Sequence, residues 1–167
     1  MDISLLKQTL EKGAHNILFV CTGNICRSPV AEYLLRDELS RLHISNTAVK
    51  SAGLLELGPQ PADPEMIEIG REHGVDLTAH RSRQISLEMV AEASVVFVME
   101  TRQKEKLSQF MPEYEEKILL LSLFDYVHYG LNIHDPLGKN RQIFNYCFSR
   151  IYKITQKLAL LVKETQP

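Results

Sequence analysis

The residues best suited to chemistry are the cysteine and the arginine of the stretch CTGNICR, Cys21 and Arg27, which follows an apolar run. Gly23 and Asn24 tolerate left-handed backbone angles, so this loop can turn successive N–H groups inward around an anion. A helix beginning just after the loop would add its own unpaired N–H groups and the positive end of its dipole. A lone cysteine at a strand end is more often a small buried hydrophobe. In these surroundings, however, a thiolate nucleophile is expected at neutral pH.

Arg27 closes the loop near a helix start, where a cation is disfavoured by the helix dipole unless an anion offsets it. A guanidinium presents a planar fork that matches two phosphate oxygens. Ser28 either caps the helix or reaches the Cys21 sulfur. The loop lacks the GxxxxGK[ST] and GxGxxG patterns of nucleotide binding, and Cys21 and Cys26 have no partners at zinc-like spacing. The sequence therefore predicts a phosphate-binding loop with a nucleophile, no metal and no cofactor.

Length and composition set the wider frame. The chain has 167 residues, 44% of them apolar and 24% charged, which is typical of one globular domain. A net charge of −2 gives no general field for nucleic acid or membranes, and three cysteines do not make a disulfide framework. No apolar run approaches the ~20 residues of a membrane span. We expect a cytoplasmic protein with an N-terminal extension over residues 1–15, helical at 2–12, and a domain over residues 16–167.

Apolar, β-branched runs alternate with helical patterns along this domain. Strands are expected at Asn16–Cys21, Thr47–Ala52, Ser94–Met99 and Lys117–Leu123. Helices are expected at Pro29–His43, Asp63–His73, Leu87–Ala93, Arg102–Phe110 and Lys139–Lys163. This alternation predicts a three-layer α/β fold, a four-stranded parallel sheet with helices on both faces. Ligands of such sheets bind beyond the carboxyl ends of the strands, where the loop after Cys21 would lie.

The string VCTGNICRSP, placed between a strand and a helix, resembles the signature of the low-molecular-weight protein tyrosine phosphatases. The similarity extends from about Asn16 through SAG (51–53), HRSRQI (80–85), VMETR (98–102) and HDP (134–136). SAGL, ADP and PEYEEK look most like the bacterial members that are paired with capsule or exopolysaccharide tyrosine kinases. The resemblance implies a phosphatase that forms a phosphocysteine and acts on a phosphotyrosine protein, such as a bacterial tyrosine kinase or its substrates.

The same resemblance assigns roles to further residues. A departing alkoxide or phenolate needs a proton, and the residues alone do not distinguish Asp135 from Asp125 or Glu100 as the donor. The family implies Asp135, the aspartate of its DP pair. It also implies a phosphate loop made of Thr22, Gly23, Asn24, Ile25, Cys26 and Ser28. Ser51 and His80 would steady Asn24 from beneath, and Cys26 would trap oxidised Cys21 as a disulfide. Cys147, on the apolar stripe of the last helix, is expected in the core.

One departure from the family concerns the wall around the substrate ring. An aromatic residue usually follows the DP pair, whereas Leu137 and Gly138 stand here. Recognition of a phosphotyrosine ring would then depend on Ile25 and Leu57, with Tyr126 or Tyr129 as further candidates.

Three alternative functions remain open from the sequence. Protein arginine phosphatases resemble this loop but carry threonine where Ile25 stands. Arsenate reductases share the fold but need resolving cysteines near residues 80–95, where this chain has none. A phosphotyrosine-binding module with weak activity is suggested only by Leu137 and Gly138.

Overall fold

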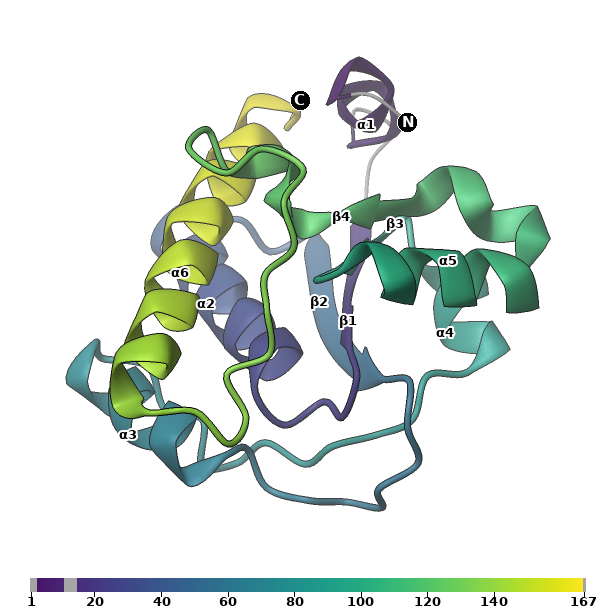
Figure 1. The fold of residues 1–167 in the computed structure, drawn as a ribbon. Helices are drawn as coiled ribbons and strands as arrows, with labels where there is room; N and C mark the ends of the chain where they lie inside the picture. The colour runs from purple at the N-terminus through teal and green to yellow at the C-terminus, as the bar shows by residue number, and fades with distance from the viewer. Residues whose placement is uncertain (1–2, 11–14, 167) are drawn as a thin grey trace.

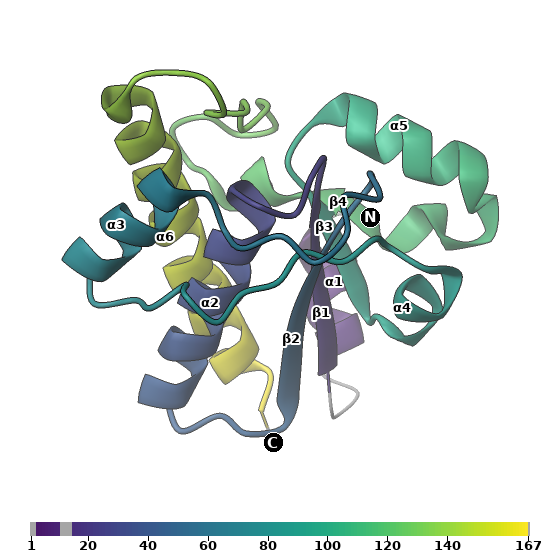
Figure 2. The same cartoon turned by 90° about the horizontal axis from the view of Figure 1, so that it is seen from below.

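The four apolar runs form one parallel sheet with the strand order β2-β1-β3-β4. The strands are β1 (His15–Cys21), β2 (Thr47–Gly53), β3 (Val95–Val98) and β4 (Ile118–Leu120). The structure is a computed structural model that describes residues 3–10 and 15–166. Helices cover both faces of the sheet, as Figures 1 and 2 show. The predicted three-layer α/β fold is confirmed.

Alternating side chains of the strands supply a core on each face. On one face lie α2 (Arg27–Arg41), α3 (Pro64–Glu72) and α6 (Arg141–Glu164), packed over the stacked rings of Phe19 and Phe97. On the other face lie α4 (Leu87–Glu92) and α5 (Thr101–Phe110), against Leu18 and Val20. Burial on both faces explains why these strands are apolar throughout instead of alternating in polarity.

The structure moves several of the expected boundaries by one to three residues, and two of these shifts have a clear physical reason. The last strand ends at Leu120, and the chain continues as the 3-10 helix η2 (Leu121–Phe124) after the 3-10 helix η1 (Pro112–Lys117). Within the described residues, β4 is an edge strand that pairs with β3 alone, and β3 is itself short, so the ladder ends with it. Helix α2 begins at Arg27, which places Pro29 inside the first turn, where a missing N–H still costs no helical hydrogen bond.

Helix α1 (Ile3–Leu10) lies near the amino ends of the strands, away from the loop that follows β1 (Figure 1). Leu6 and Leu10 are buried in the same core as α2 and α6, and Lys7 pairs with Glu164 at 3.6 Å. The remaining ends of the expected helix, residues 2, 11 and 12, fall outside the described residues. None of the described helices has the length and apolar character needed to cross a membrane.

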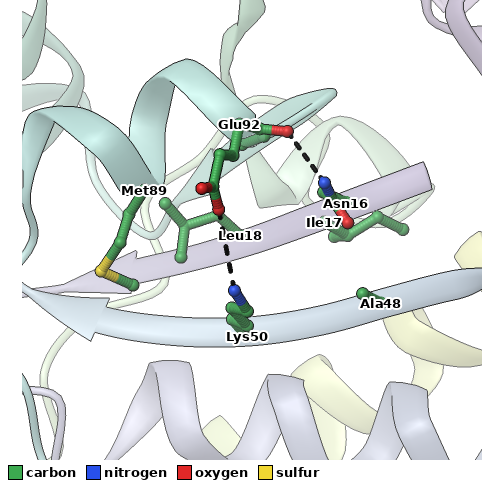
Figure 3. Close-up of a pocket in the computed structure, with 8 residues that line it drawn as sticks. Asn16, Ile17, Leu18, Ala48, Lys50, Met89 and Glu92 are labelled. Atoms are coloured by element: carbon green, nitrogen blue, oxygen red, sulfur yellow. Dashed lines mark hydrogen bonds and ion pairs between the residues drawn. The ribbon is translucent and has the colours of Figure 1, made fainter.

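A small hollow beside β1 and β2 has a structural explanation. Figure 3 shows the side chain of Lys50 on β2 directed at Glu92 of α4, at 3.9 Å, and Asn16 donating to the Glu92 carbonyl at 3.0 Å. The cavity has a volume of about 20 Å³, enough for roughly one water molecule. These contacts attach α4 to the sheet, and the hollow is part of that packing.

Candidate active site

The loop between β1 and α2 folds into a tight turn at the carboxyl end of the sheet. Asn24 adopts a positive φ of 54°, a left-handed conformation that asparagine tolerates better than most residues. Gly53 lets the loop approach β2, because a Cβ there would lie 2.9 Å from the Gly23 carbonyl carbon. The glycine of SAG is therefore required by close backbone contact.

The Cys21 sulfur is buried at the base of this loop. Its Sγ lies 3.1 Å from the Ser28 hydroxyl and accepts from the Asn24 backbone N–H at 3.3 Å. Ser28 is the second residue of α2, since Cys26 occupies the N-cap position without a side-chain cap. The alternative in which Ser28 caps the helix is therefore wrong.

Asn24 is the centre of a buried polar network beneath the loop. Its side-chain amide donates to Ser28 at 2.9 Å and to Ser51 at 2.8 Å. Its side-chain oxygen accepts the Arg83 backbone N–H at 3.0 Å. Its backbone carbonyl accepts from Nε2 of His80 at 2.7 Å. The structure thus brings together Asn24, Ser51 and His80, which the sequence analysis expected beneath the loop.

Glu32 completes this network and was not foreseen. It is buried in α2, and the Ser51 hydroxyl donates to its carboxylate at 2.6 Å. Burial lowers the pKa of His80, although its bond to Asn24 and the nearby Glu32 act in the opposite direction. In the sequence, Glu32 is the acidic residue of the otherwise apolar stretch PVAEYLL, and this position was the signal that could have indicated a buried polar role.

The Arg27 guanidinium is fully buried, which is unusual for arginine, and is held from several sides. Nη1 donates to the Glu100 carboxylate and, at 2.9 Å, to the Ile133 carbonyl. Nη2 donates to Asp135 at 2.5 Å, while Nε is buried with no partner among the described residues. Burial alone would lower the pKa of Arg27, but the facing negative groups, led by Cys21 and then Asp135, raise it instead.

Glu100 and Gln103 connect the site to α5. Glu100 is buried, and its second oxygen accepts from Nε of the exposed Arg102 at 2.6 Å. Gln103 accepts from the Met99 and Glu100 backbone N–H groups, and its amide donates to the Thr22 hydroxyl at 3.2 Å. From the sequence, Glu100 is only one of the possible acids, and nothing in the sequence indicates Gln103.

The segment before α6 carries Asp135 to Arg27. The backbone N–H of Ile133 donates to the Met99 carbonyl at 2.9 Å, which attaches this segment to the end of β3. Asp135 is about one-third exposed, whereas Arg27 and Glu100 are buried. Asp125 instead pairs with Arg150 at 2.9 Å. Among the candidate acids, the structure therefore places Glu100 and Asp135 beside Arg27 and holds Asp125 elsewhere.

The other two cysteines are buried thiols close to the loop. Burial raises the pKa of Cys26 far above its ordinary value, assisted by Asp63 and Asp135. Burial also raises the pKa of Cys147 to about 12. Cys147 lies in the apolar core, as expected. No group of three metal-ligating side chains occurs among residues 3–10 and 15–166.

The mouth of the loop is aliphatic. Leu57 and Ile25 both lie beside Gly23, where an added Cβ would meet the Leu57 side chain at 3.0 Å and the Ile25 side chain at 3.6 Å. Leu137 is about half exposed. Tyr126 lies elsewhere, because its ring covers Nζ of Lys157 at 3.7 Å. Lys157 is sixteen residues after the start of α6, which is ~24 Å along the helix. The expected contribution of Tyr126 to the ring wall is therefore wrong, and that of Tyr129 stays a prediction.

Fold and site together are typical of enzymes that transfer phosphoryl groups through a cysteine. A thiol lies at the end of a parallel strand, under a turn that opens a helix, with a buried guanidinium beside it. Such a turn and helix terminus form an anion site.

The comparisons with known proteins agree with this class. Residues 16–167 match the model of the family "Low molecular weight phosphotyrosine protein phosphatase". The chain belongs to this family and is a protein-tyrosine-phosphatase. The protein-tyrosine-phosphatase Wzb of Escherichia coli K12 is 37% identical over 145 residues, which cover 87% of this chain and 90% of that protein. The family expected from the sequence, and its bacterial character, are confirmed.

Solved structures show the same fold. Wzb of Vibrio vulnificus, in complex with benzylphosphonate, has a TM-score of 0.79 and 32% identity, over 89% of this chain and 99% of that one. The YwlE arginine phosphatase of Geobacillus stearothermophilus has a TM-score of 0.81 and 29% identity, over 90% and 94% of the two chains. The fold alone therefore does not distinguish the phosphorylated amino acid.

Proposed function

We propose that this protein hydrolyses phosphotyrosine in two steps, with Cys21 as the nucleophile and Asp135 as the proton donor. The Cys21 thiolate attacks phosphorus and the bond from phosphorus to the tyrosine oxygen breaks, while Asp135 transfers its proton to that oxygen. In the second step the Asp135 carboxylate takes a proton from water, whose oxygen attacks the phosphocysteine. Inorganic phosphate leaves and the thiolate is restored.

One observation carries this proposal: the Cys21 sulfur, the unpaired Nε of Arg27 and the Asp135 carboxylate meet at one loop. A buried unpaired N–H is costly, and a phosphate oxygen would satisfy it. The same guanidinium would stabilise charge on the equatorial oxygens during transfer. Neither role requires a metal ion or a cofactor.

The remaining loop residues would hold the phosphate and the turn. The backbone N–H groups from Thr22 to Ser28 would surround the phosphate oxygens, including those of Gly23, Asn24, Ile25 and Cys26. The Ser28 hydroxyl, 3.1 Å from Sγ, would stabilise the thiolate both as attacking and as leaving group. Ser51 and His80 would act through Asn24, by maintaining its left-handed turn.

The aliphatic mouth favours an aryl phosphate over phosphoarginine. Ile25 and Leu57 offer apolar surface to a ring, and neither provides a hydrogen-bond acceptor for a guanidinium. Sulfhydryl-dependent arsenate reduction lacks its resolving cysteines, because the remaining thiols are Cys26 and Cys147. Arginine phosphatase is the second candidate, on the basis of the similarity to YwlE.

The biological setting is part of the proposal. The relatives named Wzb and EpsP support a bacterial tyrosine kinase, or the proteins it phosphorylates in exopolysaccharide regulation, as the substrate. Such a role would place the enzyme in the cytoplasm.

A kinetic panel tests this function. Phosphotyrosine, phosphoarginine and phosphoserine peptides and arsenate would be compared for the unchanged protein, Cys21→Ser and Cys147→Ser. We expect phosphotyrosine to be preferred, Cys21→Ser to have no measurable turnover, and Cys147→Ser to remain active. Activity that survives Cys21→Ser would contradict the mechanism, and a preference for phosphoarginine would establish the second candidate.

A further inference from the structure

A groove runs along the outer surface of α6, beside the segment that leads to Asp135. Residues 125–131 lie against this helix: the His128 ring contacts the Tyr146 hydroxyl at 3.0 Å, and Tyr126 covers Lys157. Between them is a cavity lined by Val127, His128, Tyr146, Lys153 and Lys157, among others. We call it the α6 groove.

The α6 groove combines exposed apolar surface with positive charge. Tyr126 and Val127 are more than 80% exposed, which is unusual for large apolar side chains in adjacent positions. Asp125 and Arg150 neutralise each other within the groove, so Lys153 and Lys157 leave it with a positive charge, although the whole chain carries −2. A second hollow, lined by Leu42, Leu160 and Glu38 among others, continues past the same two lysines, and its one carboxylate, Glu38, is paired with Arg41 at 3.4 Å. Such a surface is complementary to a segment that carries both carboxylates and apolar side chains.

The groove is connected to the active site through one short stretch of backbone. Arg150, which lines the groove, donates to the Asn132 carbonyl at 2.9 Å. The next carbonyl, of Ile133, accepts from Arg27, and Asp135 follows two residues later. A ligand in the groove would therefore contact the same segment that positions the proposed acid.

The separation suits a single substrate polypeptide. Lys153 lies twelve residues after the start of α6, ~18 Å at 1.5 Å per residue. An extended chain covers ~3.3 Å per residue, so about six residues of a bound segment would run from the start of α6 to Lys153.

We propose that the α6 groove is a docking site for the substrate protein and binds an acidic, partly apolar segment of the same polypeptide as the phosphotyrosine. The inference rests on the proposed function, and it adds a second contact that small aryl phosphates cannot make.

The test compares one phosphotyrosine peptide in three versions. One carries a Glu-rich segment on its carboxyl side, one carries it on its amino side, and one has Gln in place of every added Glu. The protein variants are Lys153→Glu, Lys157→Gln and the control Lys163→Glu, which changes the same charge at an exposed position on another face of α6. A small aryl phosphate serves as the reference substrate.

Only one of the two acidic peptides can place its Glu-rich segment in the groove. We expect that peptide to be hydrolysed with a kcat/KM roughly three- to tenfold above that of the Gln peptide, mainly through a lower KM. Lys153→Glu should remove this advantage, Lys157→Gln should reduce it, and Lys163→Glu should leave it unchanged. Turnover of the aryl phosphate should be the same in all variants. The advantage should also disappear near 1 M salt, where charges are screened beyond ~3 Å.

Two results would overturn the docking site. One is an equal kcat/KM for all three peptides, and the other is a loss for Lys153→Glu that is as large with the aryl phosphate. If the unchanged protein hydrolysed no phosphoester, the proposed function would fail, and fluorescence anisotropy with the unphosphorylated acidic peptide would still test the groove. Binding that weakens in Lys153→Glu but not in Lys163→Glu would support it, and no binding would contradict it.

Discussion

The Asp135 carboxylate lies 2.5 Å from Nη2 of Arg27, so the proposed acid and the proposed phosphate ligand form one ion pair. A bound phosphate would compete with this carboxylate for the guanidinium. The pairing also holds Asp135 beside the loop that carries Cys21.

Asp135→Asn should therefore separate two effects of the carboxylate, which are proton donation to the leaving group and competition with phosphate for Arg27. We expect kcat for an aryl phosphate with a poor leaving group to fall by roughly 10²–10⁴, because no proton is supplied. An activated p-nitrophenyl ester should lose less. Inhibition by inorganic phosphate should become stronger, because the competing charge is gone. An equal loss for both esters would contradict the role of Asp135 as the acid.

Glu100→Gln should weaken the support of Arg27. The buried carboxylate receives Arg27 on one oxygen and Arg102 on the other. Removing its charge should lower the free energy of unfolding by about 1–3 kcal/mol and raise the KM for phosphate esters. Urea unfolding and steady-state kinetics measure the two effects. Arg102→Ala, which removes only the exposed partner, should cost less than about 1 kcal/mol. A larger loss of unfolding free energy for Arg102→Ala than for Glu100→Gln would mean that the exposed Arg102–Glu100 pair, and not the buried Arg27–Glu100 pair, stabilises the fold.

Substitutions of Asn24 distinguish its backbone role from its side-chain role. Asn24→Gly retains access to the positive φ of 54° but loses the bonds to Ser28 and Ser51. Asn24→Ala loses these bonds and also strains the turn, which adds about 1 kcal/mol. We expect both variants to have lower kcat, and Asn24→Ala to be the less stable one in thermal unfolding. Equal stability of the two would show that the turn is not strained.

His80 should make stability depend on pH. Burial lowers its pKa in the folded protein below the ordinary value of 6.5. Between these two pKa values the unfolded chain binds more protons than the folded protein, so lowering the pH favours unfolding. The contribution is fully present above pH 6.5 and is lost as the pH falls towards the folded pKa.

The pH effect can be measured by denaturant unfolding between about pH 5 and 8. His80→Gln, which can still donate to the Asn24 carbonyl, should show a flatter profile below pH 6.5. Substitution of the exposed His43 by Asn, which tolerates its positive φ, should leave the slope unchanged. A slope in His80→Gln equal to that of the unchanged protein would assign the effect to another group.

Cys26→Ser should change the response to hydrogen peroxide. Peroxide converts the Cys21 thiolate to a sulfenic acid, which condenses with the Cys26 thiol to give a disulfide and water. Without Cys26, further oxidation of Cys21 should make the loss of activity irreversible by dithiothreitol. The control Cys147→Ser should recover as the unchanged protein does. Full recovery of Cys26→Ser would exclude this protective role.

The sequence by itself determined the sheet, the order of strands and helices, and the loop that carries Cys21 and Arg27. Apolar runs of strand length and helical periodicity are local signals, and the string VCTGNICRSP depends on residues that are neighbours in the chain. The strand that ends at Leu120 is shorter than the sequence predicts, because the end of an edge strand depends on the length of its partner.

Only the tertiary structure decided which distant groups support the site. Glu32 on α2 and Glu100 after β3 are charged residues of an ordinary kind in the sequence, yet one closes the Ser51 network and the other holds Arg27. Likewise, residue type alone leaves Asp125 and Asp135 as equal candidates and only the family resemblance selects Asp135, whereas the structure pairs Asp125 with Arg150 and Asp135 with Arg27. The physical reason is that a carboxylate's partner is set by how helices and loops pack across a hundred residues, and no local pattern of residues encodes that packing.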